Sequence, residues 1–327
     1  MNTTMTTEEK KSAIASKTAK GGFLVEIECT AKINNYKNDT EAQQWLYVWG
    51  VNPKDVQTIK AVHIPNTFTE KSTIIQNREL NIDYNMFKKL EQGENESIDS
   101  LMKREEQRQK IVAEFYSFKK TDVQITITDI YGKIYVINLT IKSFAGRDGF
   151  NQLDRRYPIQ YQKDECITMT NEVRTLLELR TGKTLPNEHN SIYFITPEKI
   201  KNYIHGIKYD EFKRKYQDLI KNFLTNNRDR LISLGLKGLG DLAATHLLVV
   251  KKIGGKRRYK MISIEEAIDI LLFEFPVEFS KSMSVANIAH GITLQRKGSK
   301  KDKRADHLQL KIKLSTFLTD ELSANNL

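Results

Sequence analysis

The sequence predicts an α/β fold in which a mixed central sheet is flanked by helices and the C-terminal half is elaborated. A strand–turn–strand pattern over residues 122–142 and two more strand pairs in the last quarter of the chain supply the sheet. Segments with helical spacing and capping residues lie between these strands and supply the helices. Strand and helix patterns that alternate in this way are typical of α/β proteins.

The composition is that of a folded chain. Of the 327 residues, 39% are hydrophobic, which is enough for a sizeable core and excludes wholesale disorder. No apolar run approaches the roughly 18–20 residues of a membrane span, and the first 20 residues lack the apolar stretch of a secretory signal. Cys29 and Cys166 are too few for a disulfide scaffold or a four-cysteine zinc site. We therefore expect a soluble, cytoplasmic protein without a membrane partner.

The charge balance points to a polyanionic partner. Lys and Arg number 52 against 41 Asp and Glu, which gives a net charge of +11. An excess of this size favours nucleic-acid binding. The alternative is that a Lys-, Asn- and Ile-rich composition reflects an AT-rich genome.

The first part of the chain gives one strand and two helices. Residues 1–20 are polar and predict a flexible tail. Alternating apolar residues over Phe23–Ile33 predict a strand. Thr40–Val51 predicts a helix with Thr40 as its N-cap candidate, and Glu96–Phe118 has clear helical spacing.

The rest of the chain alternates helices with strand pairs. A glycine-bearing basic loop is expected from Ala145 to Asp164, followed by helices over Asn171–Gly182, Pro197–Ile204 and residues 209–234. The last quarter predicts a strand–turn–strand over His246–Ile262, a capped helix over Ser263–Phe273, and strands over His290–Gly298 and Asp306–Leu314.

The hairpin over residues 122–142 has a loop that fixes its register. Gly132 takes the third position of a three-residue loop, where left-handed backbone is required and glycine adopts it without strain. This loop pairs Asp129 with Lys133, and counting back along both strands brings Asp122 opposite Thr140.

Asp122, Thr140 and Lys142 therefore share one face at the end of this hairpin. A carboxylate and a hydroxyl oxygen are ligands of the kind that Mg²⁺ prefers. A neighbouring ammonium can orient a water for attack on a phosphodiester. The alternative is an edge hairpin with a solvated polar face.

The same residues resemble the PD-(D/E)xK nuclease core. That core has an Asp-bearing strand followed about twenty residues later by a strand ending in x-Lys, as Asp122 and Lys142 are placed here. The segments GFNQLDRRYPIQY and GITLQRKGSKKDKRADHLQLKI are similar to segments of type II restriction endonucleases. The resemblance spans residues 96–314 and implies a restriction-endonuclease-like fold, Mg²⁺ as cofactor and double-stranded DNA as substrate.

Two positions depart from the family pattern. Thr121 stands at the proline of the motif, and Thr140 at the acidic residue before x-Lys. Because threonine is a neutral and weaker ligand, the metal needs a second carboxylate. Glu105 in the helix before the hairpin is the first candidate, because its spacing lets it face the sheet; Glu106 is the second and Glu114 the third. The alternative is a solvated or ion-paired helix face.

Two basic segments are candidates for DNA contact. After the hairpin, amides suited to adenine and guanidinium groups suited to guanine or phosphate occur together; these are Asn151, Gln152, Arg155 and Arg156. The alternative is a solvated loop in which Asp154 pairs with an arginine.

The second segment, residues 295–313, holds eight Lys or Arg against two Asp. Its candidates for DNA contact are Gln295, Arg296, Lys297, Lys300 and Lys301. Gln295-x-Lys297 is also the fallback for the catalytic x-Lys element, and Gln309 an alternative base reader. A solvated lysine loop is the competing interpretation.

The resemblance implies the following organisation and function. We divide the chain into a tail (1–20), an N-terminal region with the nuclease-like core (21–204) and a C-terminal α/β region for DNA recognition (205–327). We expect a type II restriction endonuclease with Asp122, Thr140, Lys142 and Glu105 as catalytic residues and Mg²⁺ bound by Asp122 and Glu105. A homodimer and a functionally linked DNA methyltransferase are also expected. The alternative is a non-catalytic DNA-binding protein or an inactive nuclease relative; an RNA-binding protein is favoured by charge alone.

Overall fold

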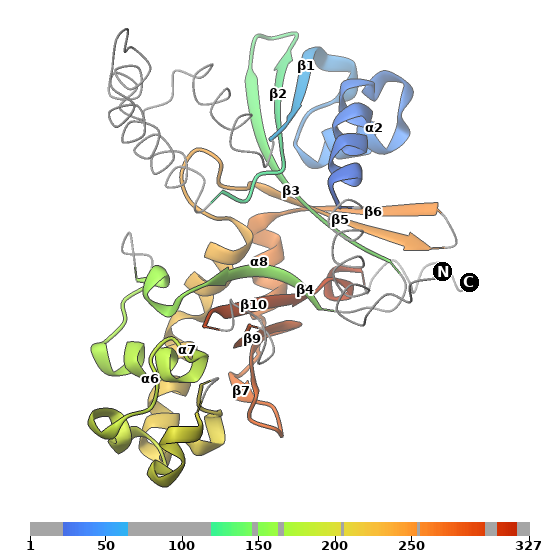
Figure 1. The fold of residues 1–327 in the computed structure, drawn as a ribbon. Helices are drawn as coiled ribbons and strands as arrows, with labels where there is room; N and C mark the ends of the chain where they lie inside the picture. The colour runs from blue at the N-terminus through green and yellow to red at the C-terminus, as the bar shows by residue number, and fades with distance from the viewer. Residues whose placement is uncertain are drawn as a thin grey trace, which may run out of the picture. The chain divides into compact units, whose positions relative to one another are not determined.

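The computed structural model describes residues 22–64, 119–145, 150–162, 167–203, 206–253, 256–297 and 306–318. It confirms the predicted α/β class, with a mixed five-stranded sheet and flanking helices (Figure 1). Contacts divide the chain into two compact units, residues 1–143 with 237–248 and residues 144–236 with 249–327. The boundary predicted between regions 21–204 and 205–327 does not coincide with the boundaries of these units. The assignment of a nuclease-like core to the first region and of DNA recognition to the second stays a prediction.

The first unit combines a helical N-terminal part with an antiparallel sheet. Its elements are a helix over residues 22–34, η1 (Tyr36–Asn38), α2 (Thr40–Val48), η2 (Pro53–Asp55), β1 (Val56–His63), β2 (Val123–Asp129) and most of β3 (Ile134–Ala145). β2 pairs with β1 on one side and with β3 on the other, both antiparallel. The buried residues of β2 face the core at every second position, which is the pattern of a strand covered on one side.

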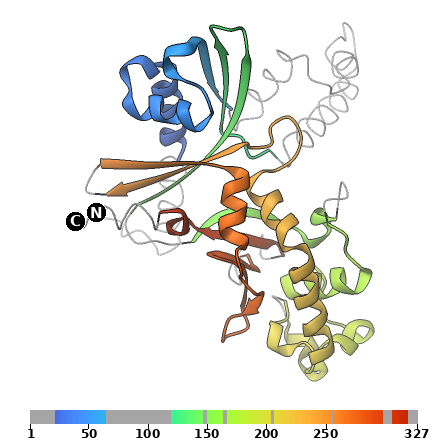
Figure 2. The ribbon, with the colours of Figure 1, turned by 180° about the vertical axis from the view of Figure 1, so that it is seen from behind.

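The second unit holds the remaining strands and the longer helices. Its elements are β4 (Phe150–Arg156), η3 (Pro158–Tyr161), α6 (Asn171–Thr181), η5 (Glu188–Tyr193), η6 (Pro197–Asn202), η7 (Tyr209–Glu211), α7 (Arg214–Leu236), most of β5 (His246–Ile253), β6 (Lys256–Ser263), α8 (Ile264–Leu272), β7 (Glu278–Phe279), β8 (Val285–Ala289), β9 (Ile292–Arg296), β10 (Leu308–Lys313) and η8 (Leu314–Phe317). α7 and α8 lie side by side when seen from behind (Figure 2).

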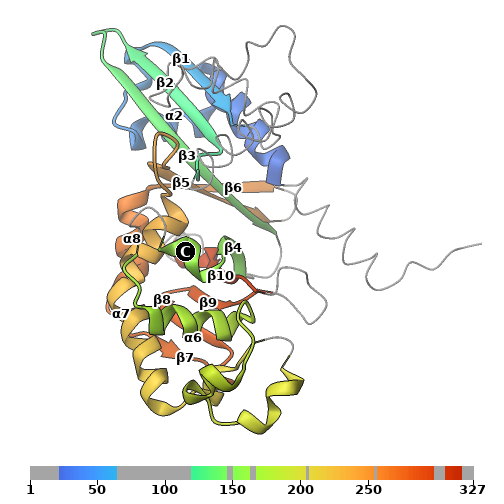
Figure 3. The same cartoon turned by 60° about the vertical axis from the view of Figure 1, so that its left-hand side comes forward.

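Two five-stranded sheets result, with strand orders β1-β2-β3-β5-β6 and β4-β10-β9-β8-β7. The second sheet packs against α7, which contacts β4 and β8, and α6 packs on α7 (Figure 3). Gly235 lets α7 approach this sheet closely, because a Cβ there would lie only 2.7 Å from Leu310 Cδ2 and 2.9 Å from Leu153 Cδ2.

The strand predicted over Phe23–Ile33 is wrong, because residues 22–34 form a helix. Val25, Cys29 and Ile33 are buried at a spacing of four, so the apolar residues that alternate in sequence also line one helix face. Asn34 at the helix end exchanges hydrogen bonds with the main chain of Ala61 in β1, at 2.8 and 3.0 Å. Tertiary packing against β1 therefore selects the helical period.

The loop predicted from Ala145 to Asp164 is also wrong in part, because Phe150–Arg156 form β4, paired with β10. The segment is polar and has a register shift between Leu310 and Lys311 of its partner strand, so regular alternation is lost. A polar strand with a bulge does not show the period that identifies strands in sequence.

The remaining elements follow the predictions closely. α2 ends before Gly50, although its N-cap is Asp39 rather than Thr40. Gly182 ends α6 with left-handed backbone, and the Ser263 hydroxyl caps α8. The strand pairs β5–β6 and β9–β10 form where expected, and the segment from residue 197 is a 3-10 helix. The tail 1–20 and the helix Glu96–Phe118 lie outside the described residues. In the part of the chain that is described, no helix is long and apolar enough to cross a membrane.

Candidate active site and nucleic-acid interface

The Asp122 carboxylate is the centre of a compact polar cluster. Its Oδ2 accepts hydrogen bonds from the Ile141 main-chain nitrogen at 2.7 Å and from Thr140 Oγ1 at 3.2 Å. Lys142 Nζ lies 3.5 Å from the same oxygen and donates to the Ile141 carbonyl oxygen at 3.2 Å. The structure therefore brings together the three hairpin side chains that the register predicted.

The hairpin loop produces this register as expected. Gly132 has a φ of +81°, and its nitrogen donates to the Asp129 carbonyl oxygen at 3.0 Å. Asp129 in turn pairs with Lys133, and Val123 lies opposite Leu139. Seven residues back from Asp129, Asp122 comes opposite Thr140.

Asp122 is held on both sides by the sheet. Its nitrogen donates to the Leu139 carbonyl oxygen and its own carbonyl oxygen accepts from the Ile64 nitrogen, both at 2.8 Å. The preceding Thr121, at the position of the motif's proline, is buried and its hydroxyl donates to the Leu242 carbonyl oxygen at 2.6 Å. The main chain around the carboxylate is therefore fixed, whereas the Asp122 and Lys142 side chains remain partly exposed.

The donors of this cluster fit a hard divalent cation. A carboxylate, a hydroxyl and the Ile141 carbonyl are all oxygen ligands, the type that Mg²⁺ prefers. All contacts of the Asp122 carboxylate go to Oδ2, so within the described residues Oδ1 has no hydrogen bond. The described residues contain no group of three or more His, Cys, Asp or Glu that could hold a metal. A metal at this place therefore needs further ligands, and Glu105, Glu106 and Glu114 lie outside the described residues.

A second polar cluster lies on the sheet β4-β10-β9. Gln309 in β10 lies opposite Gln295 in β9 and opposite Arg155 in β4. Gln309 Nε2 donates to Gln152 Oε1 at 2.9 Å, and Gln295 Nε2 lies 3.4 Å from Gln309 Oε1. Three strands therefore bring their amide side chains into one row.

The structure separates the predicted DNA-contacting residues between the two faces of this sheet. The face with Gln309 also carries Lys311, which lies opposite Gln152, and by alternation Lys297. The other face carries Asn151 opposite Ile312, and Arg156 and Arg296 on either side of Leu308.

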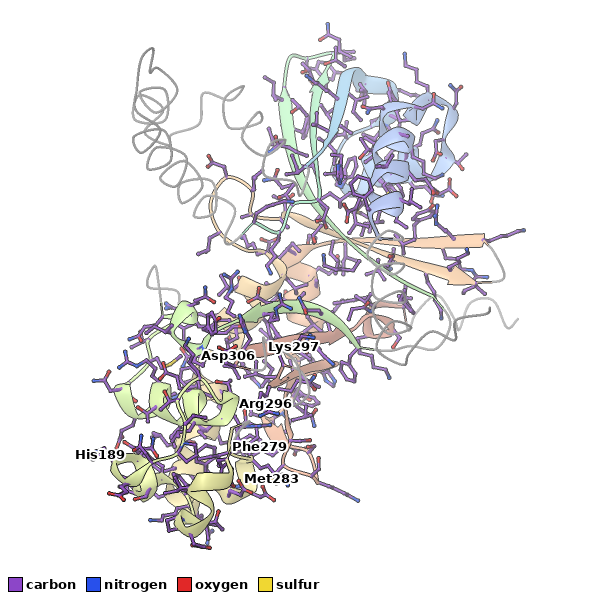
Figure 4. All side chains as sticks on the ribbon, viewed as in Figure 1. His189, Phe279, Met283, Arg296, Lys297 and Asp306 are labelled. Atoms are coloured by element: carbon purple, nitrogen blue, oxygen red, sulfur yellow. The ribbon has the colours of Figure 1, made fainter. Side chains whose placement is uncertain are left out.

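Arg156 and Arg296 differ in their surroundings. Arg156 is buried and its Nε lies 2.8 Å from Asp154 Oδ2, which is the ion pair that the alternative interpretation anticipated. Burial, followed by the charge of the buried Arg180, lowers the pKa of the Arg296 guanidinium. Arg296 and Lys297 lie together at the end of β9 (Figure 4).

The Gln309 face is positively charged. Lys311 and Lys297 share this face with Arg155, and burial, followed by the charge of Lys297, lowers the pKa of the Lys311 ammonium. The Lys297 main-chain nitrogen donates to the His307 carbonyl oxygen at 2.8 Å. Lys300 and Lys301 lie between these two residues in the sequence. Lys300 and Lys301 themselves lie outside the described residues.

The sequence did not reveal the coupling of the glutamines. Strand alternation indicates Gln295 and Gln309 on one strand face each, but Gln152 joins them only because of the register shift in β4. Gln152 precedes a polar run that lacks a regular period, so no sequence signal identifies its face.

Two comparisons with known proteins give matches. The model of a protein family described as R.HinP1I restriction endonuclease matches residues 107–318, which is 212 of the 327 residues. The crystal structure of restriction endonuclease MspI in complex with its cognate DNA matches with a TM-score of 0.51 and 11% sequence identity, covering 89% of this chain and 88% of that chain. At this identity the second match shows a shared fold. No curated protein sequence matches the chain.

Proposed function

The chain belongs to the R.HinP1I restriction endonuclease family, and we propose that it cuts both strands of DNA at a specific sequence with Mg²⁺ as cofactor. The family and the fold support sequence-specific DNA cleavage. The observation that carries the proposal further is the cluster in which Thr140, Ile141 and Lys142 all contact Oδ2 of Asp122.

Each residue of this cluster has a distinct role in the proposal. Asp122 binds the metal, and Glu105 supplies the second carboxylate that Thr140 cannot. Thr140 holds the Asp122 carboxylate through its hydroxyl. When bound, Mg²⁺ lowers the pKa of a water and neutralises charge on the phosphate. Lys142 positions the attacking water and stabilises the negative charge that develops on the phosphate.

The polar face of the second sheet supports a role in DNA recognition. The amides of Gln152 and Gln295 and the guanidinium of Arg155 suit base edges in the major groove, while Lys297, Lys300 and Lys301 suit phosphates. Asn151, Arg156 and Arg296 lie on the opposite face of the same sheet. We assign the half-buried Asn151 and Arg296 to contacts with the DNA backbone, whereas the buried Arg156 is held by Asp154 and is not assigned to DNA.

The wider setting follows from the chemistry. An enzyme that cuts a specific sequence needs a DNA methyltransferase acting on the same sequence in the same cytoplasm. A homodimer would match a palindromic site, because its two-fold symmetry repeats the protein contacts on both half-sites.

Cleavage of plasmid DNA with and without Mg²⁺ tests the proposal. Discrete fragments that require Mg²⁺ support it, and sequencing of their ends gives the site and the position of the cut. The second candidate is a sequence-specific DNA-binding protein without cleavage, which Thr140 in place of an acidic residue favours. A mobility shift with intact plasmid in Mg²⁺ supports that candidate instead.

A further inference from the structure

Gln309 lies at the centre of a directed chain of three glutamine amides. Its Nε2 donates to Gln152 Oε1 at 2.9 Å, and its Oε1 accepts from Gln295 Nε2 at 3.4 Å. Gln309 is only 6% exposed, whereas Gln152 is exposed and Gln295 half-buried. The central amide is therefore withdrawn from solvent and the two outer amides are accessible.

A bulge in β4 brings Gln152 into this chain. Leu310 lies opposite Asp154 but the next residue, Lys311, lies opposite Gln152, so Leu153 is an extra residue in β4. With regular pairing Gln152 would lie opposite Ile312, on the other face. Bulges are known to re-aim side chains in this way. Leu153 is buried against α7 near Gly235, which holds the extra residue in place.

The direction of the chain determines what each outer amide can offer. A glutamine has one oxygen that accepts and one NH₂ that donates. Gln152 uses its oxygen toward Gln309, and Gln295 uses its NH₂. Among the described residues, the Gln152 NH₂ and the Gln295 oxygen have no hydrogen-bond partner. Gln152 is thus left with a donor and Gln295 with an acceptor.

We propose that Gln309 is a positioning residue that fixes the amide orientation of Gln152 and Gln295, so that Gln152 presents a donor and Gln295 an acceptor to the bases. This inference rests on the proposed function. An isolated glutamine can turn its amide over, so it can face either a donor or an acceptor on a base edge. If the amide of Gln152 or Gln295 turns over, its hydrogen bond to Gln309 breaks. The hydrogen bonds to Gln309 therefore give these two adaptable side chains one fixed pattern of donor and acceptor.

The main test compares the cleavage rates of wild type and variants on every single-base substitution of the site. Gln309→Leu, which keeps the volume but removes the amide, should reduce discrimination about 10-fold at the same base pairs as Gln152→Leu and Gln295→Leu. Because the three act as a unit, the double variant of Gln152 and Gln309 should lose less than the product of the single losses. Gln217→Leu is the matched control, since its amide also donates a hydrogen bond, to Tyr209, but lies on α7.

Gln309→Glu separates orientation from packing. A carboxylate accepts but cannot donate, so Gln152 must turn its NH₂ toward residue 309 and present its oxygen instead. At the base pair read by Gln152 this variant should therefore change which base is preferred, whereas Gln309→Leu only weakens the preference. Weakened discrimination without a new preference would overturn the orientation argument.

Side-chain amide NMR signals give a readout that does not depend on activity. Signals of Gln152 and Gln295 should shift in Gln309→Leu and stay in place in Gln217→Leu. Unmoved signals, or an unchanged substitution profile in Gln309→Leu while Gln152→Leu alters it, contradict the role of Gln309 alone. Absence of sequence-specific cutting and binding in wild type contradicts the proposed function instead.

Discussion

Lys142 Nζ lies 3.5 Å from Asp122 Oδ2 and 3.2 Å from the Ile141 carbonyl oxygen. The ammonium thus lies between two oxygen atoms of the kind that Mg²⁺ prefers. A divalent cation held by the Asp122 carboxylate would compete with this ammonium for the same oxygen.

Replacing Lys142 with Ala should abolish DNA cutting while leaving DNA affinity within a few-fold. One charge beside the phosphate contributes more in the transition state than in binding. Metal affinity should be unchanged or higher, because the variant removes a competing cation. Single-turnover cleavage and calorimetric titration with metal measure the two effects. Lys133→Ala is the control, since Lys133 lies at the other end of the same hairpin, over the Tyr135 ring. Full activity in Lys142→Ala would remove this hairpin from the mechanism.

Asp122→Ala should reduce the cleavage rate on the order of 10³-fold or more, the effect typical of removing a group that stabilises charge in a transition state. Binding to the site in Ca²⁺ should be weaker or unchanged. Asp218→Ala, an exposed carboxylate on α7, is the control. Cleavage near the normal rate with Mg²⁺ would point to Gln295 and Lys297 as the catalytic centre.

Local chemistry explains the part of the candidate active site that the sequence predicts. The requirement for left-handed backbone at Gly132 sets the loop, and the loop sets the register that brings Asp122 opposite Thr140. Every step depends on residues less than 20 positions apart in sequence. By contrast, the helix over residues 22–34 depends on packing against β1, and Phe23–Ile33 alternates well enough to suggest a strand. Periodicity alone does not separate these outcomes.

The amide row of the second sheet depends on contacts between distant segments. Gln152 and Gln309 are 157 positions apart, and their contact requires the extra residue Leu153 in β4. The position of a bulge is set by the partner strand and by α7, so the isolated sequence of β4 does not reveal it. Segments that recur in a family can be recognised in sequence, whereas the contact between them becomes visible only in the fold.

Thr140→Val should reduce the cleavage rate about 10-fold without unfolding the protein. The substitution removes the hydroxyl that donates to Asp122 Oδ2 and keeps the shape of a buried side chain. A hydrogen bond to a charged group contributes roughly 1.5–3 kcal/mol, so its loss leaves the carboxylate less firmly oriented. Thr140→Ser keeps the hydroxyl and should retain most of the activity. Equal losses in both variants, measured as single-turnover rates, would show that packing rather than the hydroxyl matters.

Cys29 should be unreactive in the folded protein and make stability depend on pH. Burial raises the pKa of its thiol to about 12, against an opposing effect of Lys32. The unfolded thiol ionises near pH 9.0, so the folded state loses stability as the pH rises from about 9 to about 12. Below pH 9 both states hold the proton and the effect vanishes.

Two measurements test this in a Cys166→Ser background, where Cys29 is the only thiol. At pH 8 the rate at which a thiol reagent labels Cys29 should equal the rate of unfolding, because the thiol is buried in the folded protein. The fall in unfolding free energy above pH 9 should be smaller in Cys29→Ala than in the single-thiol protein. Rapid labelling at pH 8 under native conditions would contradict the burial of Cys29.

The basic residues of segment 300–304 and the amide row should affect DNA binding in different ways. Changing Lys300, Lys301, Lys303 and Arg304 together to Gln should lower the slope of log affinity against log salt by about 0.9 for each phosphate that these side chains neutralise in the wild type. Sequence preference should persist, because phosphate contacts position the protein without specifying bases. An unchanged slope would show that these four side chains do not reach the DNA phosphates.

Gln152→Ala and Arg155→Ala should leave the salt slope nearly intact and relax discrimination at particular base pairs, by roughly 1–3 kcal/mol each where the contact is bidentate. Both side chains belong to the face of β4 that is aligned with Gln309. Arg155 lies opposite Gln309 and Gln152 is hydrogen-bonded to it, so the two variants should affect neighbouring base pairs of the site. Binding of single-base-substituted duplexes in Ca²⁺ measures the change. Unaltered preferences in both variants would transfer base reading to Gln295, because it is the remaining accessible amide of the same face.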